Sequence, residues 1–223
     1  MSSCKGSMNF CASISRDSSR MTTERKQVPL SLRSIITNHY FYSMKRIAIF
    51  CGSKMGNDPA YEQAARELTK TLVEKEIEIV YGGGDVGLMG VVAETALENN
   101  GIITGVIPDK LYEMEVAHTG ITKLYRVKDM HERKALMADL SDGFIALPGG
   151  VGTLEEMTEV MTWAQIGYHN KPCAFLNTNG YYDHFIAFFD HMEEQGFLYK
   201  SLHDQAIVEE DVGRLIQEIS LIF

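Results

Sequence analysis

One segment of the chain combines a flexible backbone with side chains that could do chemistry. In Pro148-Gly149-Gly150-Val151-Gly152-Thr153-Leu154-Glu155-Glu156, three glycines precede a hydroxyl and two carboxylates. Glycine lets the backbone approach a ligand closely, and the start of the helix expected over 153–166 would offer free N–H groups to an anion. We therefore interpret the segment as an anion-binding loop, in which Thr153 caps the helix or holds a phosphate.

The two glutamates of this loop could serve two purposes. We expect Glu155 and Glu156 in the first helical turn, where the helix dipole favours acidic side chains. That purpose would need only one exposed glutamate, and a carboxylate beside an anion site repels the anion. The alternative is a chemical task, such as stabilising a positive charge or activating water.

Two cations lie near the start of the helix expected over 129–140. In Met130-His131-Glu132-Arg133-Lys134, Arg133 and Lys134 are close to the helix N-terminus. Because cations are unfavourable there, their placement suggests a phosphate or carboxylate partner elsewhere in the fold. The alternative is a solvated helix face.

Two further glycine-rich turns follow an expected strand and open an expected helix. The first spans 51–56 and the second spans 82–90. Glycine also makes ordinary turns, but three such turns at the carboxyl edge of one sheet favour a shared phosphorylated ligand. The candidate binding residues in these two turns are Gly52, Ser53, Gly83, Gly84, Gly87, Met89 and Gly90.

The turn sequences argue against two familiar nucleotide-binding classes. None matches G-x-x-x-x-G-K-[ST], which disfavours a P-loop NTPase. The first turn does not match G-x-G-x-x-G, and no acidic residue closes the second strand, which disfavours a redox dinucleotide. The cysteines form no C-x-x-C pair and the histidines show no ligand spacing, so we expect reduced thiols and no structural metal.

Apolar runs of strand length alternate with helical patterns from residue 44 onward. Several runs are continuous, as in strands that are covered on both faces of a parallel sheet. The alternation predicts a single-domain α/β fold with a Rossmann-like doubly wound parallel sheet. Strands are expected over 47–51, 77–81, 102–107, 124–127, 143–147, 173–177 and 206–208, and further helices over 59–75, 88–98, 182–195 and 211–219.

Composition and charge divide the 223 residues at Met44. Residues 1–43 contain ten serines and a net charge of +4, whereas residues 44–223 carry −13. We expect residues 1–43 to be a disordered or misassigned extension, with a targeting signal or a docking arm as alternatives. The acidic domain over 44–223 argues against nucleic-acid binding, and no apolar run has transmembrane length, so we expect a cytoplasmic protein without nucleic-acid or membrane partners.

Taken in order, the motifs resemble those of the LOG family. These proteins are cytokinin riboside 5′-monophosphate phosphoribohydrolases, often mislabelled as lysine decarboxylases. The similarity covers residues 44–223 and includes P-G-G-x-G-T-x-x-E over 148–156, G-G-G-x-x-G-L-M-G over 82–90, M-H-x-R-K over 130–134, S-D-x-F-I-A-L-P over 141–148 and T-W-A-Q-x-G over 162–167. It implies a Rossmann-like homodimer without a cofactor that hydrolyses the N-glycosidic bond of adenine-type nucleoside 5′-monophosphates to free base and ribose 5-phosphate.

The resemblance also implies which residues form the site. Arg133 and Glu156 match the catalytic arginine and glutamate of the family motifs. The segment around Glu115 departs from the family's usual sequence, and Glu113 could take its place. The implied substrate contacts are Glu115, Lys134, Thr162 and the loop residues Gly149, Gly150, Val151, Gly152, Thr153, Leu154 and Glu155.

The chemistry of a glycosidic cleavage suits these residue types. We hypothesise that Glu156 stabilises oxocarbenium character on the ribose or activates water, while Arg133 holds the substrate and stabilises the leaving base. A non-catalytic carrier or sensor of a phosphorylated nucleotide or cofactor would share the glycine loops without needing both side chains. A lysine decarboxylase would need pyridoxal phosphate on a lysine, for which the sequence offers no plausible context.

Overall fold

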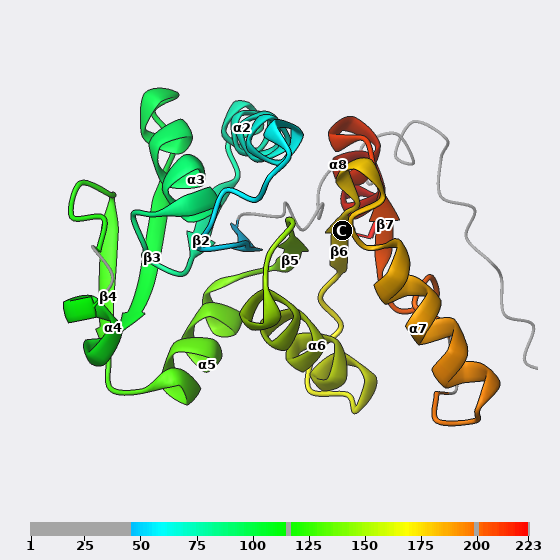
Figure 1. The fold of residues 1–223 in the computed structure, drawn as a ribbon. Coiled ribbons are helices and arrows are strands. Elements are labelled where there is room, and N and C mark those ends of the chain that lie inside the picture. The colour runs from blue at the N-terminus through cyan, green and yellow to red at the C-terminus, as the bar shows by residue number, and fades with distance from the viewer. Residues whose placement is uncertain (1–45, 115–116, 199–200, 223) are drawn as a thin grey trace, which may run out of the picture. The chain divides into compact units, whose positions relative to one another are not determined.

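A parallel sheet of seven strands forms the centre of the fold (Figure 1). The computed structural model describes residues 46–114, 117–198 and 201–222. The strand order is β4-β3-β2-β1-β5-β6-β7, and every neighbouring pair is parallel. The strands are β1 (Arg46–Phe50), β2 (Glu78–Tyr81), β3 (Ile103–Pro108), β4 (Lys123–Val127), β5 (Gly143–Ala146), β6 (Cys173–Leu176) and β7 (Ile207–Glu209). The expected Rossmann-like doubly wound α/β fold is confirmed.

Helices cover both faces of this sheet. On one face lie α2 (Pro59–Glu74), α3 (Gly87–Glu98) and α8 (Val212–Ser220); on the other lie α5 (Met130–Leu140), α6 (Val151–Gln165) and α7 (Asp183–Glu194) (Figure 1). Alternate residues of a strand point to opposite faces, so β1 contributes Ile47 and Ile49 to one hydrophobic cluster and Ala48 and Phe50 to the other. Burial on both faces explains why the strand sequences read as continuous apolar runs.

The chain changes direction across the sheet between β1 and β5. These strands are paired neighbours, and β2, β3 and β4 extend the sheet on one side while β6 and β7 extend it on the other. Leu147 N donates to Phe50 O at 2.9 Å, and Gly52 N donates to Pro148 O at 3.1 Å. The first and third glycine-rich turns therefore leave the sheet side by side at this switch point, where α/β folds bind ligands.

The helix N-termini are satisfied in two different ways. Asp58, Asp129 and Asp211 cap α2, α5 and α8 by accepting hydrogen bonds from backbone N–H groups of the first turn. By contrast, α6 follows Gly150 and has no side-chain cap. The first N–H groups of a helix have no intrahelical acceptor. In α6 they have no side-chain acceptor either.

The start of α6 differs from the expectation. The helix begins at Val151 rather than Thr153, because Gly152 adopts helical angles despite its weak helix propensity. Thr153 is therefore the third helical residue, and the prediction that it caps the helix is wrong. Glu155 and Glu156 lie in the second turn, so their expected place in the first turn is also wrong.

Two short elements were not predicted: α4 (Asp109–Met114) directly after β3, and the 3₁₀ helix η1 (Thr178–Gly180) after β6. The first has six residues and the second has three, so neither carries a periodic apolar face long enough to be recognised. The segment 1–43 and Glu115 lie outside the described residues.

No helix within the described ranges has both the length and the apolar character needed to span a membrane.

Candidate active site

A cavity of about 310 Å³ lies at the carboxyl ends of β1, β2 and β5, above the switch point. Its walls come from all three glycine-rich turns and from the start of α5. Ligands of α/β folds bind at this edge of the sheet. The lining residues are Ile49, Phe50, Cys51, Gly52, Ser53, Gly82, Met89, Met130, Arg133, Gly150, Val151, Gly152, Thr153, Glu155 and Glu156.

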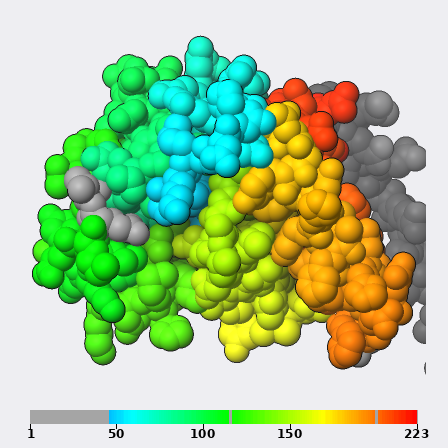
Figure 2. Space-filling view, viewed as in Figure 1, coloured from blue at the N-terminus to red at the C-terminus, as the bar shows by residue number. Residues whose placement is uncertain are grey.

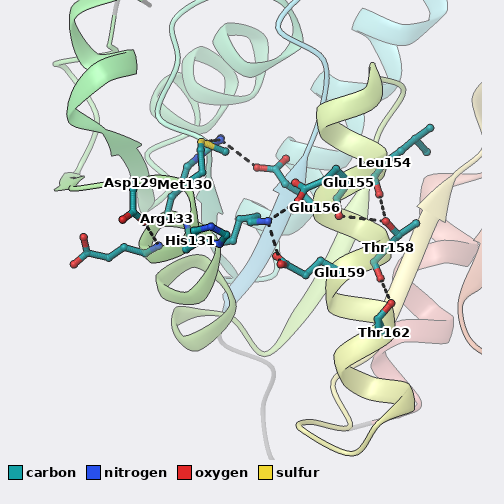
Figure 3. A network of polar contacts seen from close by, with 12 residues as sticks. Asp129, Met130, His131, Arg133, Leu154, Glu155, Glu156, Thr158, Glu159 and Thr162 are labelled. Atoms are coloured by element: carbon teal, nitrogen blue, oxygen red, sulfur yellow. Dashed lines mark hydrogen bonds and ion pairs between the residues drawn. The ribbon is translucent and has the colours of Figure 1, made fainter.

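Arg133 and Glu156 form an ion pair at the back of this cavity. Arg133 Nη1 lies 3.3 Å from Glu156 Oε1, and the two side chains are only 11% and 10% exposed. Arg133 Nε donates to Val106 O at 3.1 Å, which fixes the guanidinium against the end of β3. The pair joins α5 to α6, as Figure 3 shows.

The Glu156 carboxylate has unused hydrogen-bonding capacity. Its contact with Arg133 has the distance of an ion pair but not the geometry of a hydrogen bond, and Oε1 accepts none from the described residues. Burial raises the pKa of Glu156, and the Arg133 cation only partly opposes this effect. A buried carboxylate with a raised pKa and a free acceptor is suited to take a proton or to face a developing positive charge.

Gly82 makes room for the Arg133 guanidinium. A Cβ atom at this position would lie 2.3 Å from Arg133 Nη2 and 3.1 Å from Met89 Sδ. Gly83 and Gly84 were expected at the site from the sequence, whereas Gly82 was not. Gly82 could have been predicted from its position directly after β2, because the backbone reaches the ligand-binding edge of the sheet there.

Lys134 is engaged by two glutamates of α6. Its Nζ forms ion pairs with Glu155 and, at 3.0 Å, with Glu159 Oε1. Lys134 is not among the residues that line the cavity, whereas Glu155 is. Both cations of α5 thus have carboxylate partners on α6, and the alternative of a solvated helix face is wrong.

The start of α6 is open toward the cavity. A Cβ atom at Gly150 or Gly152 would meet no atom within 4 Å. Thr153 lines the cavity with a buried side chain, and its Oγ1 packs on Gly149, where a Cβ atom would lie 2.1 Å away. The uncapped N–H groups of the first turn of α6 are therefore accessible to an anion of phosphate size.

Several glycines of the second turn support the site without lining it. Gly87 has a φ of +61°, and a Cβ atom there would lie 2.3 Å from the backbone of Ser53. Gly83 has a φ of +79° and packs on Ile107. Gly84 pairs with the backbone of 117, and Gly90 packs on the carbonyl of 85. Of these residues, Gly87 brings the second turn against the first one.

Three other candidates do not face the cavity within the described residues. Leu154 packs against the hydrophobic cluster beneath α6. Thr162 donates from Oγ1 to Thr158 O at 2.7 Å, two turns further along the same helix (Figure 3). Gly149 lines a neighbouring cavity of about 340 Å³ instead.

The sequence analysis also missed Met130 and Cys51, which line the cavity. The sulfur of Met130 lies 3.8 Å from Arg133 Nη1. Burial raises the pKa of the Cys51 thiol, which keeps it neutral and unsuited to nucleophilic attack. Cys51 and Cys173 are both free and buried, as expected for reduced thiols.

Sequence comparisons relate the chain to a set of curated enzymes. A family model described as "Possible lysine decarboxylase" matches residues 89–219. The cytokinin riboside 5′-monophosphate phosphoribohydrolase of Rhodococcoides fascians is 44% identical over 176 residues, which cover 78% of this chain and 89% of that protein. The Arabidopsis thaliana enzyme of the same name, LOG7, is 49% identical over 154 residues, covering 69% and 71% of the two chains.

Solved structures share the fold at lower identity. The molybdenum cofactor binding protein of Rippkaea orientalis has a TM-score of 0.61 and 18% identity, covering 80% of this chain and 97% of that one. The molybdenum cofactor carrier protein of Chlamydomonas reinhardtii has a TM-score of 0.60 and 18% identity, covering 80% and 98%. At this identity the likeness extends to the fold alone.

Proposed function

Because this chain belongs to the family of the curated cytokinin riboside 5′-monophosphate phosphoribohydrolases, we propose that it hydrolyses the N-glycosidic bond of adenine-type nucleoside 5′-monophosphates. In this reaction the bond between C1′ and the base nitrogen breaks, and a bond between C1′ and a water oxygen forms. The water supplies the new hydroxyl of ribose 5-phosphate and the proton of the free base.

The observation that carries the proposal is the distance between two features of α6. Its open N-terminus at 151–153 offers N–H groups to a phosphate, and Glu156 lies three residues further on. Three residues of helix span about 4.5 Å, which is comparable to the distance between the 5′-phosphate and C1′ of a nucleotide. A phosphate held at the helix start would therefore bring C1′ close to Glu156.

The two charged side chains can then divide the chemistry. The Glu156 carboxylate would stabilise the positive charge that develops on the ribose ring and accept a proton from the attacking water. The Arg133 guanidinium, fixed by Val106 O, would stabilise the negative charge of the leaving base. Binding energy from the phosphate would favour nucleotides over nucleosides, because it can be used to orient the reacting atoms.

The description of the family model names a different chemistry, which the site residues do not support. A pyridoxal-dependent decarboxylase needs a lysine for the Schiff base. Among the described residues, none of those lining the cavity is a lysine, and Lys134 is engaged by Glu155 and Glu159.

We also propose that the domain spans residues 44–223 and acts as a cytoplasmic homodimer. Large apolar side chains just after the end of α6 are exposed, with Ile166 at 61% and Tyr168 at 80%. Such a surface supports association between copies of the chain. The free thiols of Cys51 and Cys173 support a reducing compartment. Light scattering on the purified protein measures its molar mass and therefore tests whether it is a dimer.

Release of free base from nucleoside monophosphates tests the function. Purified protein is incubated with AMP and with isopentenyladenosine 5′-monophosphate, and the products are separated by chromatography. We expect free base and ribose 5-phosphate in equal amounts, and we expect Glu156→Ala to lower the rate by about 10²- to 10⁴-fold. The matched control is Glu67→Ala, because Glu67 is an exposed residue of α2.

Two outcomes would contradict the proposal. Full activity of a folded Glu156→Ala variant would remove Glu156 from the mechanism. Stoichiometric binding of the nucleotides without any base release would instead identify a carrier, which needs the anion-binding loop but not the chemistry.

A further inference from the structure

Three successive carbonyl groups before α6 are each held by a donor. Leu147 O accepts from Tyr182 Oη at 2.6 Å, and Pro148 O accepts from Gly52 N at 3.1 Å. Gly149 O accepts from Tyr181 Oη at 2.5 Å. The carbonyl oxygens of Leu147, Pro148 and Gly149 thus all accept hydrogen bonds from the protein itself before any ligand binds.

This occupation decides which way the loop presents its backbone. In a trans peptide the carbonyl of one residue and the N–H of the next point in opposite directions. Tyr181 holds Gly149 O on its own side, so the N–H of Gly150 points away from Tyr181. Gly149 and Gly150 would otherwise rotate at little cost, because glycine tolerates most backbone angles. A carbonyl oxygen turned into the cavity would repel a phosphate.

The two tyrosines are themselves fixed by the turn after β6. Asn177 accepts from Tyr182 N at 2.6 Å through Oδ1 and donates to Asp183 Oδ1 at 2.8 Å through Nδ2. Asn177 and Tyr182 are 6% and 1% exposed, so this arrangement is buried. Burial also raises the pKa of Tyr182, which keeps its hydroxyl protonated as a donor.

The same turn contacts the start of α2. Asn179 Nδ2 donates to Asp58 Oδ2 at 2.9 Å, and Asp58 caps α2. The rings of Tyr61 and Tyr181 meet edge to face with centroids 5.4 Å apart. Figure 2 shows the golden segment after β6 against the cyan segment at the start of α2. The tyrosines are therefore attached to the scaffold on two sides.

We infer that Tyr181 and Tyr182 are positioning residues for phosphate binding: their hydroxyls hold Gly149 O and Leu147 O outward, so that the N–H groups of the anion-binding loop are arranged for the 5′-phosphate before the substrate binds. The inference rests on the proposed function, because it assigns these side chains to the phosphate end of the same site. Neither side chain touches the reacting atoms in this role, and a preorganised loop raises affinity by lowering the cost of ordering on binding.

Tyr181→Phe tests the inference, since it removes one hydroxyl and keeps the ring. We expect the Kd for ribose 5-phosphate, measured by calorimetry, and the KM for AMP to rise by about 3- to 10-fold, as for loss of one hydrogen bond. The kcat at saturating AMP should change by less than a factor of about 2, because Arg133 and Glu156 are untouched. This split between KM and kcat distinguishes positioning of the phosphate from general loss of structure.

Tyr61→Phe is the matched control. Its ring packs on Tyr181, but no described residue receives a hydrogen bond from its hydroxyl, so its Kd and KM should equal those of the wild type. A second variant, Tyr182→Phe, should weaken ribose 5-phosphate binding in the same direction and also lower the Tm, because Leu147 O is left buried without its donor.

Unchanged affinity for ribose 5-phosphate in Tyr181→Phe would overturn the inference, as would an equal loss in Tyr61→Phe or a loss confined to kcat. The binding measurement does not depend on catalysis. Wild-type protein that binds ribose 5-phosphate but releases no base would contradict the proposed function and leave the tyrosine test intact.

Discussion

At the scale of single residues, the pairing of Arg133 with Glu156 sets two tendencies against each other. Burial makes the ionised carboxylate unfavourable, and the neighbouring guanidinium partly compensates. The result is a carboxylate whose pKa is raised above that of an exposed glutamate. Residues with this property are common at catalytic sites, because a useful base has a pKa close to the working pH.

The raised pKa of Glu156 predicts the acid side of the pH profile. If the ionised carboxylate is the active form, activity falls as pH drops through the pKa of Glu156. Because burial raises that pKa above the ordinary 4.5, the fall should begin at higher pH than for an exposed glutamate. Measurements of kcat/KM against pH should show this decline in the wild type.

The substrate phosphate also titrates near pH 6, so Glu156→Gln provides the reference. Any decline that persists in the residual activity of this variant belongs to the substrate. A wild-type profile with the same acid side as Glu156→Gln would show that the carboxylate does not titrate during catalysis.

The sequence indicates which residues belong to the site more clearly than it indicates which of them contact one another. Glu156 and Arg133 could be selected because their motifs combine charge with glycine turns and helix starts. The ion-pair partners of Lys134 could not be predicted from the sequence, because they depend on which faces of α5 and α6 pack together. The hydrogen bonds from Tyr181 and Tyr182 span 32 and 35 positions, beyond the reach of any local pattern.

At the scale of elements, the contact between α5 and α6 depends on a lysine placed between two glutamates. Lys134 Nζ lies between Glu155 and Glu159, and its side chain is 11% exposed. This partly buried cation neutralises the acidic face of α6 next to the anion-binding loop. It also holds together the two helices that carry Arg133 and Glu156.

Lys134→Met should therefore destabilise the fold and weaken anion binding, because it keeps the aliphatic stem but leaves two carboxylates unneutralised. We expect a loss of about 2 kcal/mol in the free energy of unfolding, between the values for exposed and fully buried pairs. Urea denaturation measures it, and the Kd for ribose 5-phosphate should rise.

Lys70→Met is the matched control, because Lys70 forms an exposed pair with Glu74 at 3.8 Å and should contribute less than about 0.5 kcal/mol. Equal effects of the two lysine variants would mean that Lys134 has no special place between the helices.

The glycines of the turns divide into two groups with opposite expectations. Gly87→Ala places a Cβ atom 2.3 Å from backbone atoms of Ser53 and Lys54 at a positive φ, so it should lower the free energy of unfolding by about 2 kcal/mol or more. In Gly152→Ala the added Cβ atom meets no atom within 4 Å and alanine has the higher helix propensity, so the free energy of unfolding of this variant should be maintained. Its methyl group should nevertheless raise the Kd for ribose 5-phosphate, because it enters the cavity.

Thermal denaturation and calorimetry on both variants check this division. A stable Gly87→Ala protein would show that the two turns are not in close backbone contact. Unimpaired binding by Gly152→Ala would place the phosphate away from the start of α6.

Strong periodicity made the larger elements predictable. The strands and the long helices lie where the apolar patterns placed them, with ends shifted by one or two residues. The expected start of α6 was two residues late because Gly152 is helical despite its low helix propensity, as happens where a residue is placed by a ligand site. The turn of η1 was missed because its three residues carry no apolar pattern, although it positions Tyr181.

At the scale of the whole molecule, the family model matches residues 89–219, and the sequence motifs of the site all follow Met44. A chain that begins at Met44 should therefore keep the Tm and the rate of base release of the full chain. Parallel purification of the two proteins and comparison of their kcat/KM values for AMP test this expectation. A large loss on truncation would assign residues 1–43 a part in folding or catalysis.

The switch point between β1 and β5 also has a consequence for how the protein is made. Arg46 N donates to Asp142 Oδ2 across 96 positions of sequence, and β1 pairs with β5. By contrast, the pairs β1–β2, β2–β3 and β3–β4 each join strands that are consecutive in the chain. Contacts between distant positions form late, because closing a long loop costs more chain entropy. During synthesis the β1–β4 half of the sheet can assemble first, while Leu147 O and Gly149 O lack their tyrosine donors until Tyr182 has left the ribosome. A nucleotide bound at this loop should therefore stabilise chains that extend beyond Tyr182 more than shorter nascent chains.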